Sequence, residues 1–100
     1  MDTKVERKKI IETLKAVKPL LRKRYGVKRL ALFGSAVRDD FKETSDVDIL
    51  VELEKPLGLE FVELGEFLSK VLNRKVDLVT PNMVKNPLVA KSIKEDLKYV

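Results

Sequence analysis

The sequence contains no cysteine, no histidine and no tryptophan, and these absences restrict its chemistry. Without cysteine there is neither a disulfide framework nor a thiolate metal site, and without histidine the commonest general base and zinc ligand is missing. Any metal must therefore be bound by oxygen ligands. Glutamine is also absent while charged residues make up 37% of the chain, a balance that resembles the hyperthermophile preference for charge over thermolabile amides.

Long apolar runs are missing as well. No stretch approaches the roughly 20 apolar residues that a membrane-spanning helix needs. The first ten residues, MDTKVERKKI, are charged where a secretory signal would be apolar, so we expect a cytoplasmic protein with no membrane segment. With 100 residues, 44% of them hydrophobic, the chain can form one compact domain over residues 1–100 but not a second, substrate-binding domain.

The chain is basic, with a net charge of +5 and a pI near 9.5. Much of the excess lies in the first helical segment, at Lys8, Lys9, Lys15, Lys18 and residues 22–24. Cations in the last turn of a helix complement its dipole, which favours a solvated helix surface. A phosphate or nucleic-acid patch is the alternative, but we expect no direct binding of nucleic acid.

The pattern of apolar and turn residues predicts short helices and strands. Thr3 as N-cap and Glu6 form a capping box that opens a first helix, Pro19 should kink or restart that helix, and Gly26 suits its end. Strands are predicted over Lys28–Phe33, Val47–Leu53 and Lys75–Val79, and further helices over Gly58–Leu72 and Pro87–Leu97, with a brief helical turn beginning at Ser35.

Two apolar stripes at helical spacing should pack on the sheet. They comprise Ile10, Ile11, Leu14, Val17 and Leu21 in the first helix, and Phe61, Leu64, Phe67, Leu68 and Val71 in the second. The fold class is therefore α/β with a small sheet flanked by helices.

The most informative segment lies between residues 30 and 52, where Gly34 and Ser35 end one apolar run and Asp46-Val47-Asp48 opens the next. Glycine has no Cβ, so the backbone at Gly34 can approach a phosphate closely. Ser35 offers a hydroxyl and an amide near a helix N-terminus, where unpaired N–H groups favour anions. This turn is a candidate phosphate site.

Three aspartates supply a candidate metal site. Asp46 and Asp48 are two residues apart on one strand and therefore share a face, where they can hold one or two divalent ions. Asp77, on a neighbouring strand, is available as a third ligand or as the base for the attacking group. The alternative interpretation is that these aspartates are solvated and that Gly34-Ser35 is an ordinary turn and helix cap. Together the residues favour Mg²⁺-dependent nucleotidyl transfer.

Gly34, Ser35, the gap of ten residues and Asp46-Val47-Asp48 resemble the signature of the minimal nucleotidyltransferases, the smallest members of the DNA polymerase β-like superfamily. Asp77 matches their third carboxylate. The resemblance implies the nucleotidyltransferase fold with a small mixed sheet, Mg²⁺, and ATP as co-substrate. Small stand-alone members are typically antitoxins that transfer AMP to a tyrosine of an all-helical HEPN ribonuclease toxin, which implies the same partner and activity here.

The resemblance also implies a role for each matching residue. Asp46 and Asp48 would bind metal, and Asp77 would complete the metal site and help to activate the tyrosine hydroxyl. Gly34 and Ser35 would hold the β and γ phosphates.

Arg38 lies where the family usually has an arginine, and we expect it to contact the nucleotide. The family often reads Gly-Ser-Arg-Ala-Arg-Gly, whereas this chain has Ala36 for the first arginine and Asp39 for the last glycine. These two changes remove a cation and add an anion, so the expected nucleotide affinity is lower.

Three functions fit the sequence. The first is an enzyme, a protein adenylyltransferase that neutralises a HEPN toxin by AMP transfer. The second is a non-catalytic antitoxin that silences its toxin by binding alone. Both functions imply a helical partner protein in a hetero-oligomer, and a homo-oligomer is also compatible with the sequence. The third, a nucleotidyltransferase acting on RNA or a small molecule, is disfavoured because the chain has no further domain to hold such a substrate.

Overall fold

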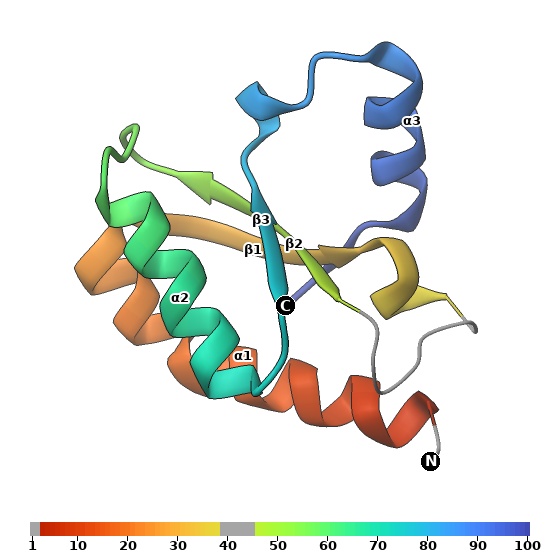
Figure 1. Cartoon of the computed structure of the whole chain (residues 1–100), viewed down its shortest axis with the longest axis horizontal. Helices are drawn as coiled ribbons and strands as arrows, with labels where there is room; N and C mark the ends of the chain where they lie inside the picture. The colour runs from red at the N-terminus through yellow and green to blue at the C-terminus, as the bar shows by residue number, and fades with distance from the viewer. Residues whose placement is uncertain (1–2, 39–45) are drawn as a thin grey trace.

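The computed structural model describes residues 3–38 and 46–100, with the backbone alone for residues 3 and 4 (Figure 1). The helices are α1 (Thr3–Tyr25), α2 (Glu60–Leu72) and α3 (Pro87–Asp96). The strands are β1 (Val27–Phe33), β2 (Val47–Leu53), β3 (Val76–Val79) and β4 (Lys98–Tyr99). Two 3-10 turns, η1 (Gly34–Val37) and η2 (Pro81–Met83), follow β1 and β3. No helix in these described ranges is long and apolar enough to cross a membrane.

The strands form one mixed sheet in the order β3-β2-β1-β4. Strand β1 is antiparallel to both β2 and β4, whereas β2 and β3 are parallel. Parallel neighbours need a crossover connection, and α2 supplies it. The small mixed sheet confirms the expected fold class.

Helices α1 and α2 lie side by side and cover one face of the sheet, while α3 lies on the other side (Figure 1). Side chains of β2 point alternately to the two faces of the sheet, and Val47, Ile49 and Val51 are fully buried on the face that meets the two helices. This alternation explains why α1 and α2 pack on that face. The buried helical residues of that layer are Ile10, Leu14, Leu21 and Tyr25 of α1 and Leu64 and Leu68 of α2. Each such leucine contributes about 1.5–3 kcal/mol by burial.

Most predicted bounds agree with the structure to within two residues. β2 matches the prediction at both ends, β1 begins one residue earlier, and α2 begins at Glu60 instead of Gly58. Gly26 has a φ of +69°, which confirms its place at the end of α1. The short strand β4 and the turn η2 were not predicted, because elements of two or three residues carry no periodic pattern.

The predicted restart at Pro19 is wrong, since α1 runs through this residue as one helix. Proline removes one backbone hydrogen bond and crowds the preceding turn. Leu14 and Leu21, both fully buried, flank Pro19 and hold both halves of α1 against the sheet. Tertiary packing therefore outweighs the local penalty at this exposed position.

The start of α1 also differs from the prediction. Thr3 is already part of the helix, so it does not precede the first turn as an N-cap would. Glu6, predicted to complete the capping box, accepts a hydrogen bond of 2.6 Å from Arg74 Nη2 and lies 3.9 Å from Lys9 Nζ. The carboxylate thus ties α1 to the segment between α2 and β3.

Candidate active site

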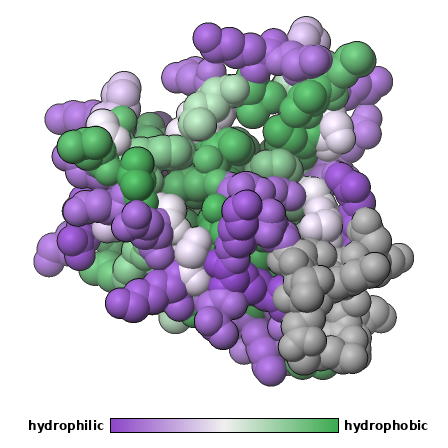
Figure 2. Space-filling view, viewed as in Figure 1, coloured by the Kyte–Doolittle hydropathy of each residue, from purple (hydrophilic) through white to green (hydrophobic). Residues whose placement is uncertain are grey.

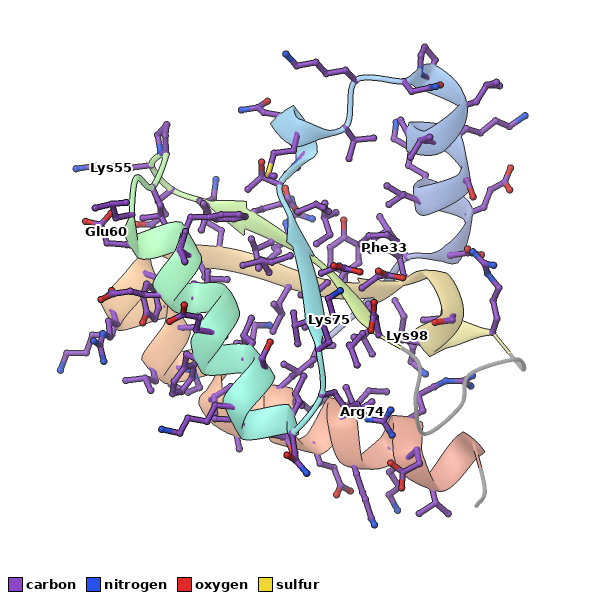
Figure 3. All side chains as sticks on the ribbon, viewed as in Figure 1. Phe33, Lys55, Glu60, Arg74, Lys75 and Lys98 are labelled. Atoms are coloured by element: carbon purple, nitrogen blue, oxygen red, sulfur yellow. The ribbon has the colours of Figure 1, made fainter. Side chains whose placement is uncertain are left out.

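The candidate site lies at the edge of the sheet where β1 ends and β2 and β3 begin. In the sheet register, Asp48 of β2 is opposite Phe33 of β1 on one side and opposite Asp77 of β3 on the other. Phe33 and Lys75, both labelled in Figure 3, mark the two strand ends that flank β2 here. The register therefore brings the turn after Phe33 and two of the predicted aspartates together.

Gly34 is required by the close contact between the turn and β2. Its φ is +66°, a conformation that side chains rarely adopt, and a Cβ added to it would collide with Oδ2 of Asp48. The turn closes through a hydrogen bond of 3.1 Å from the amide of Arg38 to the carbonyl of Ser35. The Ser35 hydroxyl donates to the Asp46 carbonyl at 3.5 Å, which joins the turn to the start of β2.

Asp48 and Asp77 form the core of the site. The two residues are opposite each other in the register of β2 and β3, with Asp48 partly buried and Asp77 exposed. Burial, the nearby charges of Asp77 and Asp46 and hydrogen bonding with Asp77 raise the pKa of Asp48 from 3.8 to about 6, although Arg38 acts in the opposite direction. Neighbouring carboxylates that repel each other form a site that a cation can occupy.

Asp46 stands slightly apart from this pair. Its carboxylate lies 4.0 Å from Lys75 Nζ, in an exposed ion pair that contributes little stability. Its charge nevertheless contributes to the raised pKa of Asp48, so it lies within electrostatic reach of that residue. Within the described part of the chain, no three acidic side chains are already gathered closely enough to hold an ion. The oxygen-only donor set suits Mg²⁺, with Asp48 and Asp77 in place and Asp46 turned toward Lys75.

Arg38 is held by α3. Its Nε and Nη2 atoms both lie 3.2 Å from Oδ2 of Asp96, the last residue of that helix. The guanidinium that we expected to contact the nucleotide therefore already has a carboxylate partner. Asp96 was not predicted as a site residue, because it belongs to no motif.

A hollow of about 360 Å³ separates the turn from α3. It is lined on the sheet side by Phe33, Gly34, Arg38 and Asp48, and on the helix side by Leu88, Val89, Ser92, Ile93 and Asp96. One wall is thus polar and carries the predicted site, and the other is largely apolar. The helix-side residues could not be found from the sequence, since the position of α3 depends on the tertiary fold.

Arg7 of α1 binds the turn from another side. Its Nε donates to the carbonyl of Ala36 and its Nη2 to the carbonyl of Arg38, both at 2.7 Å. Ala36 itself is fully buried in the hydrophobic core, so its side chain has a packing role. Asp39, the second departure from the family pattern, lies outside the described residues.

The chain matches a known protein family and several relatives with names. The model of the nucleotidyltransferase domain family matches residues 7–100. A Methanocaldococcus jannaschii relative, named as a candidate protein adenylyltransferase, is 48% identical over 92 residues, which span 91% of this chain and 94% of the relative. Protein adenylyltransferase MntA of Thermococcus cleftensis is 46% identical over 88 residues, or 87% of this chain and 88% of that protein.

Solved structures show the same fold. A structure described as a minimal nucleotidyltransferase superposes with a TM-score of 0.71 at 27% identity, covering 98% of this chain and 95% of its own. A Shewanella oneidensis complex of an MNT antitoxin with a tri-AMPylated HEPN toxin has a chain that matches with a TM-score of 0.57 at 23% identity, covering 97% of this chain and 70% of its own. The family model and the relatives agree with the observed fold, and the chain belongs to the nucleotidyltransferase domain family.

Proposed function

We propose that this chain is a Mg²⁺-dependent protein adenylyltransferase antitoxin that transfers AMP from ATP to a tyrosine hydroxyl of a helical HEPN toxin. The observation that carries the proposal is the pairing of Asp48 with Asp77 in the sheet register, directly beside the Gly34 turn. Two relatives with 46–48% identity over most of their length bear the name of this activity. ATP and a cytosolic toxin would place the reaction in the cytoplasm.

The reaction forms a bond between the tyrosine oxygen and the α phosphorus of ATP and breaks the bond from that phosphorus to the pyrophosphate oxygen. Pyrophosphate leaves, and Asp77, the most exposed of the three aspartates, accepts the hydroxyl proton in this proposal. Asp46 and Asp48 would hold Mg²⁺, which supplies charge neutralisation of the phosphate oxygens when bound. The backbone of Gly34 and the hydroxyl of Ser35 would position the β and γ phosphates.

The surroundings of the site support a protein as the acceptor. Met83 of η2 and Leu88 and Val89 of α3 are 54%, 79% and 48% exposed. Apolar side chains gather over α3 and the segment before it on the face shown in Figure 2. Leu88 and Val89 also line the hollow beside the turn, whereas Met83 lies outside it, so the apolar surface extends beyond the hollow that a nucleotide would cover.

A second candidate, an antitoxin that acts by binding alone, is favoured by one observation. The pair between Arg38 and Asp96 neutralises the cation that should contact the nucleotide. In that case the apolar patch would carry the whole function, and the aspartates would be dispensable for neutralisation.

Intact-mass spectrometry of the toxin encoded beside this chain separates the two candidates. The toxin is incubated with this protein, ATP and Mg²⁺, using the unaltered chain, Asp46→Asn/Asp48→Asn, and Glu52→Gln as a matched control. Glu52 lies on the same face of β2 but pairs with Arg29 at 3.4 Å, away from the site. We expect AMP additions with the unaltered chain and with Glu52→Gln, and none with the double variant. An unmodified toxin in a tight complex would instead support binding alone.

A further inference from the structure

Arg7 is the residue of α1 that contacts the Gly34 turn, and the proposed function does not use it. Its guanidinium donates two hydrogen bonds of 2.7 Å, to the carbonyls of Ala36 and Arg38, across 29 and 31 residues of sequence. We propose that Arg7 is a positioning residue for the phosphate-binding turn, which it holds against Asp48 in the geometry that triphosphate binding requires. This inference rests on the proposed function.

The turn is a 3-10 helix of four residues that is closed by its own backbone hydrogen bonds, the last of them from Arg38 to Ser35. A long bond of 3.5 Å from the Ser35 hydroxyl joins it to β2. Hydrogen bonds from a charged donor are roughly twice as strong as neutral ones. The two bonds of 2.7 Å from Arg7 therefore add a strong link between the turn and α1.

Arg7 is well placed to give this support. The next turns of α1 carry Ile10, which is 4% exposed, and Leu14, which is fully buried against the sheet. The guanidinium thus projects from a fixed part of the core. Gly34, at the other end of the turn, already lies so close to Asp48 that there is no room for a Cβ. A turn released from Arg7 could shift by a fraction of an ångström and lose the alignment of its backbone with the carboxylates.

The charge of Arg7 has a second consequence. Arg38 is paired with Asp96, whereas the hydrogen-bond partners of Arg7 in the described ranges are both backbone carbonyls. Carbonyl oxygens do not cancel a full positive charge, so Arg7 adds a cation beside the turn that partly offsets the charge of the three aspartates. That cation favours a triphosphate more strongly than an uncharged nucleoside.

Two variants and one control test this role in the full chain. Arg7→Gln removes the charge and one of the two hydrogen bonds, and Arg7→Lys keeps the charge but not the two-pronged geometry. Lys15→Gln is the control, because Lys15 is an exposed cation on the same helix that lies two turns farther from the site. Binding of ATP with Mg²⁺ and of adenosine is measured by NMR titration well below the melting temperature.

We expect Arg7→Gln to weaken ATP binding about tenfold and Arg7→Lys about threefold, since each loses part of a charge-assisted contact. Adenosine binding should be unchanged in both, and Lys15→Gln should behave like the unaltered chain. If Arg7 only stabilised the fold, the variants would lose affinity for ATP and adenosine together, and the loss would increase with the drop in melting temperature. If Arg7→Gln does not fold, Arg7→Lys decides the question in the same way.

The failures are distinguishable. Unchanged ATP affinity in both variants, or a parallel loss for adenosine, overturns the role of Arg7 while leaving the proposed function in place. An unaltered chain that binds no ATP in the presence of Mg²⁺ overturns the proposed function, and the role of Arg7 falls with it.

Discussion

Asp48 of β2 and Asp77 of β3 are direct neighbours in the parallel register. The two residues are close in space because α2 returns the chain beside β2, not because they are close in sequence. Partial burial of Asp48, together with the neighbouring charges of Asp77 and Asp46, raises the pKa of Asp48 to about 6. Several measurable properties depend on this pair.

The first prediction concerns stability as a function of pH without metal. The Asp48 carboxyl has a pKa of about 6 in the folded protein and of 3.8 in the unfolded chain, so protonation of Asp48 favours the folded state. This contribution to stability is fully present below pH 3.8 and is lost as the pH rises through about 6. Asp48→Asn should therefore stabilise the protein at pH 7.5 by on the order of 1 kcal/mol, a value limited by the partial exposure of Asp48. Chemical denaturation of both proteins between pH 3.5 and 8 measures the difference. If Asp48→Asn were still more stable than the unaltered chain below pH 3.8, the prediction would be contradicted.

The second prediction is that Mg²⁺ stabilises the protein in a pH-dependent way. Because the ion competes with the proton of Asp48, millimolar Mg²⁺ should raise the melting temperature by on the order of 5 °C at pH 7.5 and by less at pH 5. Thermal scans with Mg²⁺, with EDTA and with Na⁺ at equal ionic strength measure this effect. Asp48→Asn should abolish it, and an equal rise with Na⁺ would show that no specific site exists.

The third prediction concerns Gly34. Gly34→Ala places a methyl group against Asp48 at a φ of +66°, so we expect it to destabilise the protein by at least about 1–2 kcal/mol and to lower AMP transfer more than tenfold. Gly65→Ala is the matched control. Gly65 lies inside α2 with its nearest neighbour, Leu78 Cδ2, at 4.0 Å, and alanine there should stabilise the helix by about 0.5–1 kcal/mol. Equal effects of both variants on transfer would refute the special role of Gly34.

The fourth prediction separates partner binding from nucleotide binding. Met83 is exposed on η2 and does not line the hollow beside the Gly34 turn. Met83→Lys should weaken toxin binding about tenfold by placing a charge in an apolar interface, while ATP affinity stays unchanged. Leu20→Lys is the control, because Leu20 is 44% exposed on α1, outside the patch. Calorimetry with the toxin measures both, and equal losses would mean that the patch is not the binding surface.

The sequence patterns located the chief parts of the site because each part has a local physical cause. The alternation of Val47, Ile49 and Val51 set the bounds of β2 and placed Asp48 on the opposite face. Gly34 was recognised as a point of close approach, and its positive φ agrees with that role. Their assignment as metal and phosphate ligands remains a prediction.

Other parts of the site could not be predicted, because no local pattern produces them. Arg7 is one of many cations in α1, and only the tertiary fold selects it to bind the carbonyls of Ala36 and Arg38. Asp96 meets Arg38 across 58 residues for the same reason. Pro19 does not restart the helix, because its local penalty is outweighed by buried leucines on both sides.

The crossover from β2 through α2 to β3 also has a kinetic consequence. Pairing the two parallel strands brings like charges at Asp48 and Asp77 together, so this part of the sheet forms against electrostatic repulsion at neutral pH. Burial of Leu64 and Leu68 from α2 supplies the compensating attraction. The pairing is also non-local, since α2 separates the two strands in the sequence, and we expect folding at neutral pH to be faster when either aspartate is replaced by asparagine.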